Sequence, residues 1–203
     1  MWIYEKKLQY PVKIKTPNAR LASQIISALG GPDGELGAAT RYLNQRYAMP
    51  SGKIIGILTD VGSEELGHGE IVAAIIHQLT RNLTPDEINA GGFDKYYIEH
   101  GTGVYPAAAS GEPFSCASIQ SKGDAICDLN EDLAAEQKAR VTYDNILRLS
   151  DDPDVNDVIK FLPSPKGNRS LPTLRRSAPH AHRVSRNTFA AIPNCKLKPP
   201  PAS

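Results

Sequence analysis

The stretch that decides the fold is KIIGILTDVGSEELGHGEIVAAIIHQLTRN, residues 53–82, which contains no proline. Its apolar residues recur at helical spacing and predict one long helix with a buried face. In the middle of that face stand Glu65 and His68, which project from the same side of a helix and can reach one ion. The whole predicted face is Leu58, Val61, Glu65, His68, Val72, Ile75 and Leu79.

A carboxylate on a buried face is costly unless it is paired or bound to a metal. The pair of Glu65 and His68 therefore favours a metal site in the core. The alternative is that the face is drawn wrongly and the pair lies on the surface, because a single Glu-x-x-His arises often by chance.

Two further predicted helices carry a glutamate on their inner faces. In residues 34–49, Glu35 shares a face with Ala39 and Tyr42. In residues 130–149, Glu136 stands in the middle of a stripe made of Leu129, Leu133, Glu136, Arg140, Tyr143 and Leu147. Such a set is typical of dinuclear carboxylate bundles, in which two helices give a Glu and two give a Glu-x-x-His. Ligands rich in carboxylate suit manganese or iron better than zinc or copper.

The bundle pattern demands a second Glu-x-x-His, which the chain lacks. The remaining histidines are not placed to supply it: His77 lies beyond the apolar run, and the others are His100, His180 and His182 in a loop and a tail. The predicted ligand set is one helix short.

The other predicted elements are helices at 18–29, 85–90 and 153–162, a long loop at 93–129, and a loose N-terminal arm at 1–16. The resulting fold class is all-α: a four-helix bundle whose last helix is missing or replaced, followed by an irregular tail. We expect the long loop to be functional or interfacial, since long loops inside compact domains are rarely idle.

Charge divides the chain into two parts. Residues 1–162 hold 15 basic residues against all 22 acids, a formal charge of −7, whereas residues 163–203 hold 8 basic residues and no acid. The tail also contains 8 of the 16 prolines. We therefore predict a helical domain at 1–162 and a disordered basic tail at 163–203.

Composition excludes several classes of protein. Three widely spaced cysteines indicate neither a disulfide framework nor a thiolate zinc site, and favour a reducing compartment. No signal-peptide core and no run of membrane-spanning length is found. The expectation is a cytoplasmic protein without a membrane partner.

Four stretches together are similar to the manganese catalase family, and most to its spore-coat (CotJC) branch. They are MWIYEKKLQYPVKIKTPN (1–18), GGPDGELGAATRYLNQRY (30–47), LTDVGSEELGHGE (58–70) and EDLAAEQKARVTYDNILRL (131–149). The resemblance covers 1–162 and implies a ferritin-like bundle with two manganese ions, hexameric assembly and dismutation of hydrogen peroxide to water and dioxygen. By this resemblance Glu35, Glu65, His68 and Glu136 match metal ligands. Tyr42 matches a residue beside the first glutamate, and the expected catalytic set is Glu35, Glu65, Glu136 and Tyr42.

After residue 162 the resemblance stops. The family continues with a helix that carries the last His ligand and a Glu three residues before it, whereas this chain has PSPKGNRSLPTLRRSAP at 163–179. One permitted back-translation of those residues, read from its second nucleotide, encodes a helical segment with the missing Glu-x-x-His. We hypothesise that the tail is a frameshift product, biological or from sequencing. Weak or single-metal loading and little catalase activity are then expected.

Three functions are consistent with these observations. The first is a manganese-dependent peroxide dismutase associated with the spore coat. The second is a structural spore-coat subunit, without significant catalysis, whose loop and arm bind other coat proteins. The third is a tail that binds nucleic acid or a protein partner; it ranks last, and nucleic acid is not an expected partner, because the frameshift explains the same residues.

Overall fold

The computed structural model describes residues 5, 7–97, 104–168, 172 and 174–176. Its α-helices are α1 (Ala19–Gly30), α2 (Glu35–Gln45), α3 (Gly52–Thr80), α4 (Pro85–Ala90), α5 (Ala125–Leu149) and α6 (Pro153–Phe161), and its 3-10 helices are η1 (Arg46–Ala48), η2 (Asp94–Tyr96) and η4 (Cys116–Ile119). Among these residues the only β-type pairings are two isolated bridges. The predicted all-α class is confirmed.

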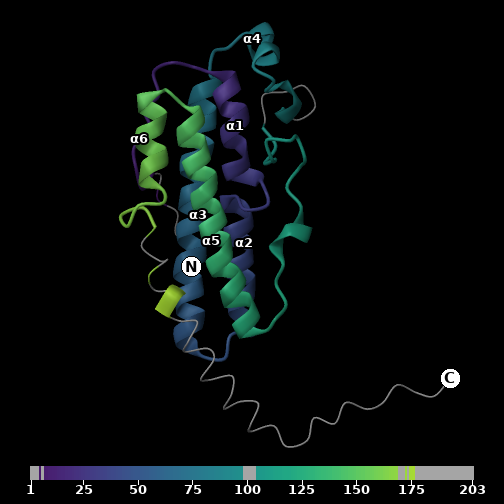
Figure 1. The fold of residues 1–203 in the computed structure, drawn as a ribbon, viewed down its shortest axis with the longest axis vertical. Coiled ribbons are helices and arrows are strands. Elements are labelled where there is room, and N and C mark those ends of the chain that lie inside the picture. The colour runs from purple at the N-terminus through teal and green to yellow at the C-terminus, as the bar shows by residue number, and fades with distance from the viewer. Residues whose placement is uncertain (1–4, 6, 98–103, 169–171, 173, 177–203) are drawn as a thin grey trace, which may run out of the picture.

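The helices form an elongated bundle around α3 (Figure 1). Helices α1 and α2 lie end to end and together run along α3, with α5 packed beside them (Figure 1). At the fourth position, α6 has nine residues and covers one end of the bundle (Figure 1), while Leu174 is buried in the part of the core at the other end. Helix α6 stops where Pro163 and Pro165 follow, since proline cannot continue a helix without losing a backbone hydrogen bond. None of the described helices is long and apolar enough to cross a membrane.

Side-chain caps explain where α1, α3 and α6 begin. Asn18 accepts a hydrogen bond from the backbone N–H of Leu21 at 3.0 Å and so starts α1. Ser51 caps α3 in the same way, and Asp152 caps α6 directly before its first-turn proline. Each cap satisfies a backbone donor that the first helical turn leaves without a partner.

The apolar core is in two parts, separated by a polar layer. One part lines the C-terminal half of α3 from Ile71 to Leu79, and the other lines its N-terminal half from Ile54 to Val61. Glu65 and His68 lie between them and are buried. The face predicted from the sequence is confirmed, because every one of its residues is buried: Leu58, Val61, Glu65, His68, Val72, Ile75 and Leu79.

Helix α5 begins at Ala125, earlier than the predicted 130–149. Asp124 caps its first turn, and the first part of α5 buries Asp128 and Asp132 beside the apolar Ala125 and Leu129. Two aspartates in inward positions hide the helical periodicity of a sequence, which is why the pattern placed the start too late.

The predicted stripe of α5 is also partly wrong. Glu136 and Tyr143 are buried as predicted, but Arg140 is exposed and pairs with Asp144 at 2.6 Å. A guanidinium at the edge of a buried face reaches solvent easily, since burying it without a partner is costly.

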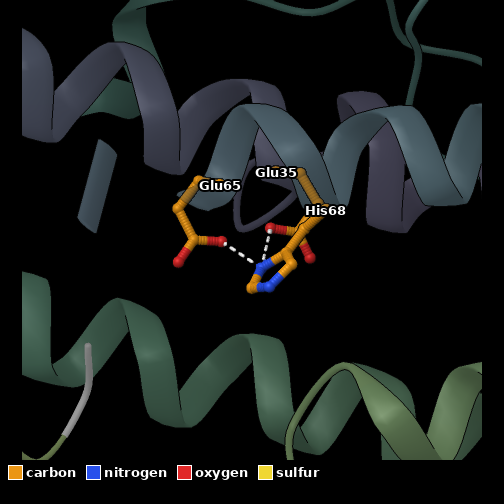
Figure 2. Close-up of side chains that lie close together, drawn as sticks. All are labelled: Glu35, Glu65 and His68. Atoms are coloured by element: carbon orange, nitrogen blue, oxygen red, sulfur yellow. Dashed lines mark hydrogen bonds and ion pairs between the residues drawn. The ribbon is translucent and has the colours of Figure 1, made fainter. Parts of the chain in front are cut away.

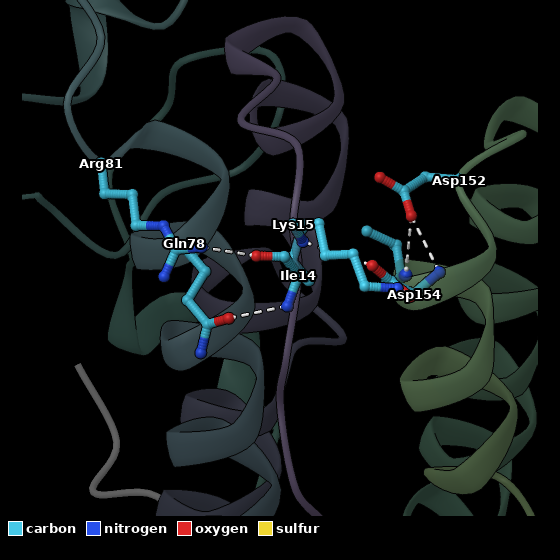
Figure 3. Close-up of polar contacts among 7 residues, drawn as sticks. Ile14, Lys15, Gln78, Arg81, Asp152 and Asp154 are labelled. Atoms are coloured by element: carbon cyan, nitrogen blue, oxygen red, sulfur yellow. Dashed lines mark hydrogen bonds and ion pairs between the residues drawn. The ribbon is translucent and has the colours of Figure 1, made fainter.

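The prediction of a loose N-terminal arm is wrong for the described part of it. Gln78 of α3 accepts a hydrogen bond from the backbone N–H of Ile14 at 2.8 Å (Figure 3). Gln78 also donates a hydrogen bond to the carbonyl of Val12 at 2.8 Å. Arg81 donates to the carbonyl of Ile14 at 2.7 Å, and Lys15 pairs with Asp154 of α6 at 3.3 Å (Figure 3). The segment therefore joins α3 to α6 instead of projecting from the bundle.

Replacing Ile75 by alanine tests whether this core stabilises the fold. The side chain is fully buried in the larger part of the core, so its truncation is expected to cost about 2–5 kcal/mol in the free energy of unfolding. Leu149→Ala is the control, since Leu149 is 63% exposed and its truncation is expected to stay within about 0.5 kcal/mol. Equal losses in the two variants, measured by urea unfolding, would show that the core is placed wrongly.

Candidate metal centre

Helices α2 and α3 bring three predicted ligands together. Glu35 is the first residue of α2, while Glu65 and His68 lie one turn apart in the middle of α3. Their ligand atoms all lie within 4.8 Å of one another, and all three side chains are buried (Figure 2). The i, i+3 spacing that identified the pair in the sequence places both on the inner side of α3, opposite Glu35.

The ring of His68 has one nitrogen toward the carboxylates and one away from them. Nδ1 lies 2.9 Å from Oε2 of Glu65 and 3.8 Å from Oε2 of Glu35 (Figure 2). Nε2 lies 2.9 Å from the carbonyl oxygen of Gly167. Nδ1 is therefore the nitrogen that faces the candidate metal position.

Glu136 and Tyr42 line the same cavity but make a separate set of contacts. The Tyr42 hydroxyl donates to Oε1 of Glu136 at 2.7 Å, and Nδ2 of Asn168 donates to Oε2 at 2.8 Å. Of the predicted site residues, Glu35, Glu65 and His68 thus form the compact cluster, with Glu136 and Tyr42 adjacent to it. His77 is exposed on α3, and His100, His180 and His182 lie outside the described residues.

Burial and mutual charge shift the pKa values of the cluster in opposite directions. Burial, together with the nearby carboxylate of Glu65, raises the pKa of Glu35 well above its usual value. Burial would also raise the pKa of Glu65, but its hydrogen bond with His68 outweighs this and lowers it. Burial lowers the pKa of His68, yet the hydrogen bond and charge of Glu65 dominate and raise it to about 9. The metal-free cluster at neutral pH is therefore an imidazolium–carboxylate pair of His68 and Glu65, beside a Glu35 that holds its proton more tightly than an exposed glutamate.

The carboxyl of Glu136 belongs to the same electrostatic group. Burial and the charge of Glu65 raise its pKa to about 7, although the hydrogen bonds from Tyr42 and Asn168 act in the opposite direction. Desolvation and carboxylate repulsion, rather than any favourable contact, dominate here. A cation placed among these carboxyls would offset their mutual repulsion and stabilise their charged forms in the buried site.

Sequence reasoning missed two contributors to the site, Gly167 and Asn168. Both lie in the tail that was predicted to be disordered, and neither residue type stands out by spacing or periodicity. It also missed the buried Arg41, which donates from Nε to the carbonyl of Ile119 at 2.8 Å and so anchors the loop before α5.

The donor set fits a hard divalent cation. Buried carboxylates with one imidazole are the ligands that manganese and iron accept. Oε1 of Glu65 is buried and has no hydrogen-bond partner within the described structure, which leaves a charged oxygen available for an ion. The adjoining cavity of about 40 Å³ admits only a few non-hydrogen atoms, since one water needs about 10–15 Å³ of the same measure. One imidazole and three carboxylates are enough for one ion.

Comparison with known proteins identifies relatives of the whole helical part. The family model described as manganese containing catalase matches residues 1–167. Protein CotJC of Bacillus subtilis is 51% identical over 162 residues, which cover 80% of this chain and 85% of that protein. A probable manganese catalase of Clostridium acetobutylicum is 33% identical over 164 residues, covering 80% of this chain and 73% of that protein.

A solved structure shares the fold. The chain is similar to KatB, a manganese catalase from Anabaena, with a TM-score of 0.73 and 24% sequence identity over 98% of this chain and 87% of that one. At this identity the likeness concerns the fold, and it confirms the ferritin-like bundle.

Proposed function

This chain belongs to the family of manganese-containing catalases, and from that membership we propose that it converts hydrogen peroxide to water and dioxygen at the buried cluster of Glu35, Glu65 and His68. The observation that carries the proposal is the geometry of this cluster: three ligand atoms within 4.8 Å, all buried, and one Glu65 oxygen without a partner. The small adjoining cavity suits a substrate of two heavy atoms.

The side chains have distinct roles in this proposal. Glu35, Glu65 and Nδ1 of His68 hold the metal, and Glu136 completes the set from α5. Manganese, when bound, would supply the redox chemistry, one electron per ion for a Mn²⁺/Mn³⁺ couple, so that the two-electron oxidation of one peroxide to dioxygen and reduction of the next to water would draw on two ions for a fast cycle. The two protons released by the first peroxide are consumed by the second. We assign their retention to two carboxylates that line the cavity: one proton to Glu136, whose Oε1 is hydrogen-bonded to Tyr42, and the other to Glu35.

We also propose that this chain holds about one manganese ion and is a slow catalase. A second ion would need a further imidazole, and among the described residues the cluster contains only His68. Since a dinuclear site normally takes one Glu-x-x-His from each of two helices, the truncated α6 leaves the second position without its ligands.

The experiment is manganese analysis and oxygen release from the full chain, purified after expression with added Mn²⁺. We expect about one bound manganese per chain, following the single-imidazole donor set, and oxygen release above that of free Mn²⁺. His68→Ala should lose both, whereas His77→Ala is the matched control, because His77 is an exposed histidine of the same helix that is not part of the cluster. Two ions per chain with rapid oxygen release would contradict the single-ion proposal.

A structural role is the second candidate function. The resemblance to the CotJC branch supports a place in the spore coat, with other coat proteins and further copies of this chain as partners. A chain that binds manganese but releases no oxygen above free Mn²⁺ would favour this role over catalysis.

The origin of residues 163–203 is a separate proposal. If the tail is a frameshift product, the gene read in the neighbouring frame after codon 162 encodes a helix with Glu-x-x-His. Resequencing that region decides it, and a nucleotide sequence that cannot encode such a helix contradicts the hypothesis.

A further inference from the structure

Residues 163–168 lie against the candidate metal centre, although the sequence after residue 162 no longer follows a helical pattern. Leu162, Pro163 and Asn168 line the cavity of the cluster, and Gly167 is buried. The segment therefore occupies the side of the site that the short α6 leaves open.

Local hydrogen bonds fold this segment into a compact turn. The Ser164 hydroxyl donates to the carbonyl of Phe161 at 2.6 Å, and the Ser164 carbonyl accepts from the backbone N–H of Gly167 at 3.0 Å and of Asn168 at 2.8 Å. The turn brings the carbonyl of Gly167 and the side chain of Asn168 to adjacent points of the site. Gln9 also donates to the Gly167 carbonyl, at 3.3 Å, and ties the turn to the N-terminal segment.

The Gly167 carbonyl decides which nitrogen of His68 carries a proton. A carbonyl oxygen only accepts hydrogen bonds, so Nε2, at 2.9 Å, must be the donor. The neutral ring then has its lone pair on Nδ1, which faces Glu65 and Glu35. In metal sites this outer contact fixes the tautomer and orientation of a histidine ligand.

Asn168 acts on the carboxylate from α5. Its amide donates to Oε2 of Glu136 at 2.8 Å, while Tyr42 donates to Oε1 at 2.7 Å. Glu136 is thus held from two sides, one on α2 and one on the tail segment. Of these two hydrogen bonds, the carboxyl of Glu136 would keep only the one from Tyr42 if Asn168 were removed.

We propose that Gly167 and Asn168 are positioning residues of the metal centre: the first sets His68 for binding through Nδ1, and the second holds Glu136 toward the same cavity. The inference rests on the proposed function. It gives residues 163–168 a role in the site, although none of them is assigned as a metal ligand or a catalytic residue. Metal affinity in this chain then depends on a segment that lies outside the helical bundle.

Position 167 is sterically restricted to glycine. A Cβ atom built there would overlap the carbonyl oxygen of Phe161 and lie 2.8 Å from that of Leu162, both backbone atoms that cannot move aside freely. Gly167→Ala should therefore displace the turn and break the contact with His68 while leaving the helices in place.

The test measures two quantities in Gly167→Ala and Asn168→Ala: the affinity for Mn²⁺ and the rate at which the Nε2 proton of His68 exchanges with solvent. We expect each substitution to weaken Mn²⁺ binding about 10–100-fold, the usual effect of removing a group that supports a ligand. In ¹H–¹⁵N spectra of metal-free protein, the Nε2 proton of His68 should exchange slowly with solvent in the wild-type chain and rapidly in Gly167→Ala. Gly56→Ala is the matched control, since a Cβ at Gly56 meets nothing within 4 Å.

The outcomes separate this inference from the proposed function. Wild-type Mn²⁺ affinity in both variants, together with a slowly exchanging Nε2 proton in Gly167→Ala, would overturn the positioning roles while the proposed function stands. A wild-type chain that binds no Mn²⁺ would contradict both. Circular dichroism and thermal unfolding of each variant verify that the loss of affinity is not a loss of fold.

Discussion

Replacing Glu65 by glutamine is expected to reduce Mn²⁺ affinity by more than about a hundredfold, beyond the range for residues that only support a ligand. The glutamine keeps the shape of the side chain but removes a charged oxygen that is buried without a partner. It also removes the carboxylate that lies 2.9 Å from Nδ1 of His68. Breaking a buried pair on one side typically costs about 3–5 kcal/mol, so the metal-free variant should also be less stable.

The same substitution at Glu35 provides the comparison. Burial raises the pKa of Glu35 well above its usual value, whereas the hydrogen bond with His68 lowers that of Glu65. Glu35→Gln, which mimics the neutral carboxyl, should therefore cost less free energy of unfolding than Glu65→Gln and still weaken Mn²⁺ binding strongly. Isothermal titration and urea unfolding of both variants measure the two effects. Equal stability losses in Glu35→Gln and Glu65→Gln would contradict the opposite pKa shifts of the two carboxyls.

The affinity for Mn²⁺ is expected to rise with pH by at least about tenfold per unit between pH 6 and 8, because metal binding must displace protons from the site. With a pKa of about 9, His68 carries a proton on Nδ1 throughout this range. Glu35 adds to the proton release, since its pKa is raised well above the usual value. Calorimetry in buffers of different ionisation enthalpy counts the protons released. Glu35→Gln should release fewer, and a pH-independent affinity would rule out proton displacement.

The stability of the metal-free protein should fall as the pH rises, whereas the affinity for Mn²⁺ should rise. His68 has a higher pKa folded, about 9, than its ordinary 6.5, so the stabilisation from its ion pair is complete below pH 6.5 and is lost as the pH rises through 9. The pKa values of Glu35 and Glu136 are also raised by folding, so above pH 4.5 the folded state holds protons that the unfolded chain releases. These two groups therefore also lower the stability as the pH rises. Unfolding midpoints measured from pH 6 to 9 without metal should therefore fall.

The sequence predicted the long central helix and its buried face correctly because both depend on local spacing. Residues three or four apart on a helix share a side whatever surrounds them. This is why Glu65 and His68 could be assigned to one point of the core before the fold was known. The glutamates of α2 and α5 were found in the same way, from their place on an inward stripe.

The prediction failed where distant segments decide the structure. The start of α5 was missed because its inward face carries Asp128 and Asp132, which interrupt the apolar pattern, and Asp132 is buried near Arg41 of α2. The N-terminal segment was predicted to be loose because nothing in residues 1–16 shows that Gln78 of α3 will bind its backbone.

The sequence by itself determined the family, the all-α class and the residues that could hold a metal, since these follow from motifs and helical periodicity. Only the tertiary structure decided how those residues are arranged: which nitrogen of His68 faces the carboxylates, and which groups hold Glu136. These features depend on hydrogen bonds between residues far apart in the chain, such as His68 with Gly167 and Glu136 with Asn168. Spacing along one helix carries no information on such pairs, because their geometry is fixed by packing and not by local periodicity.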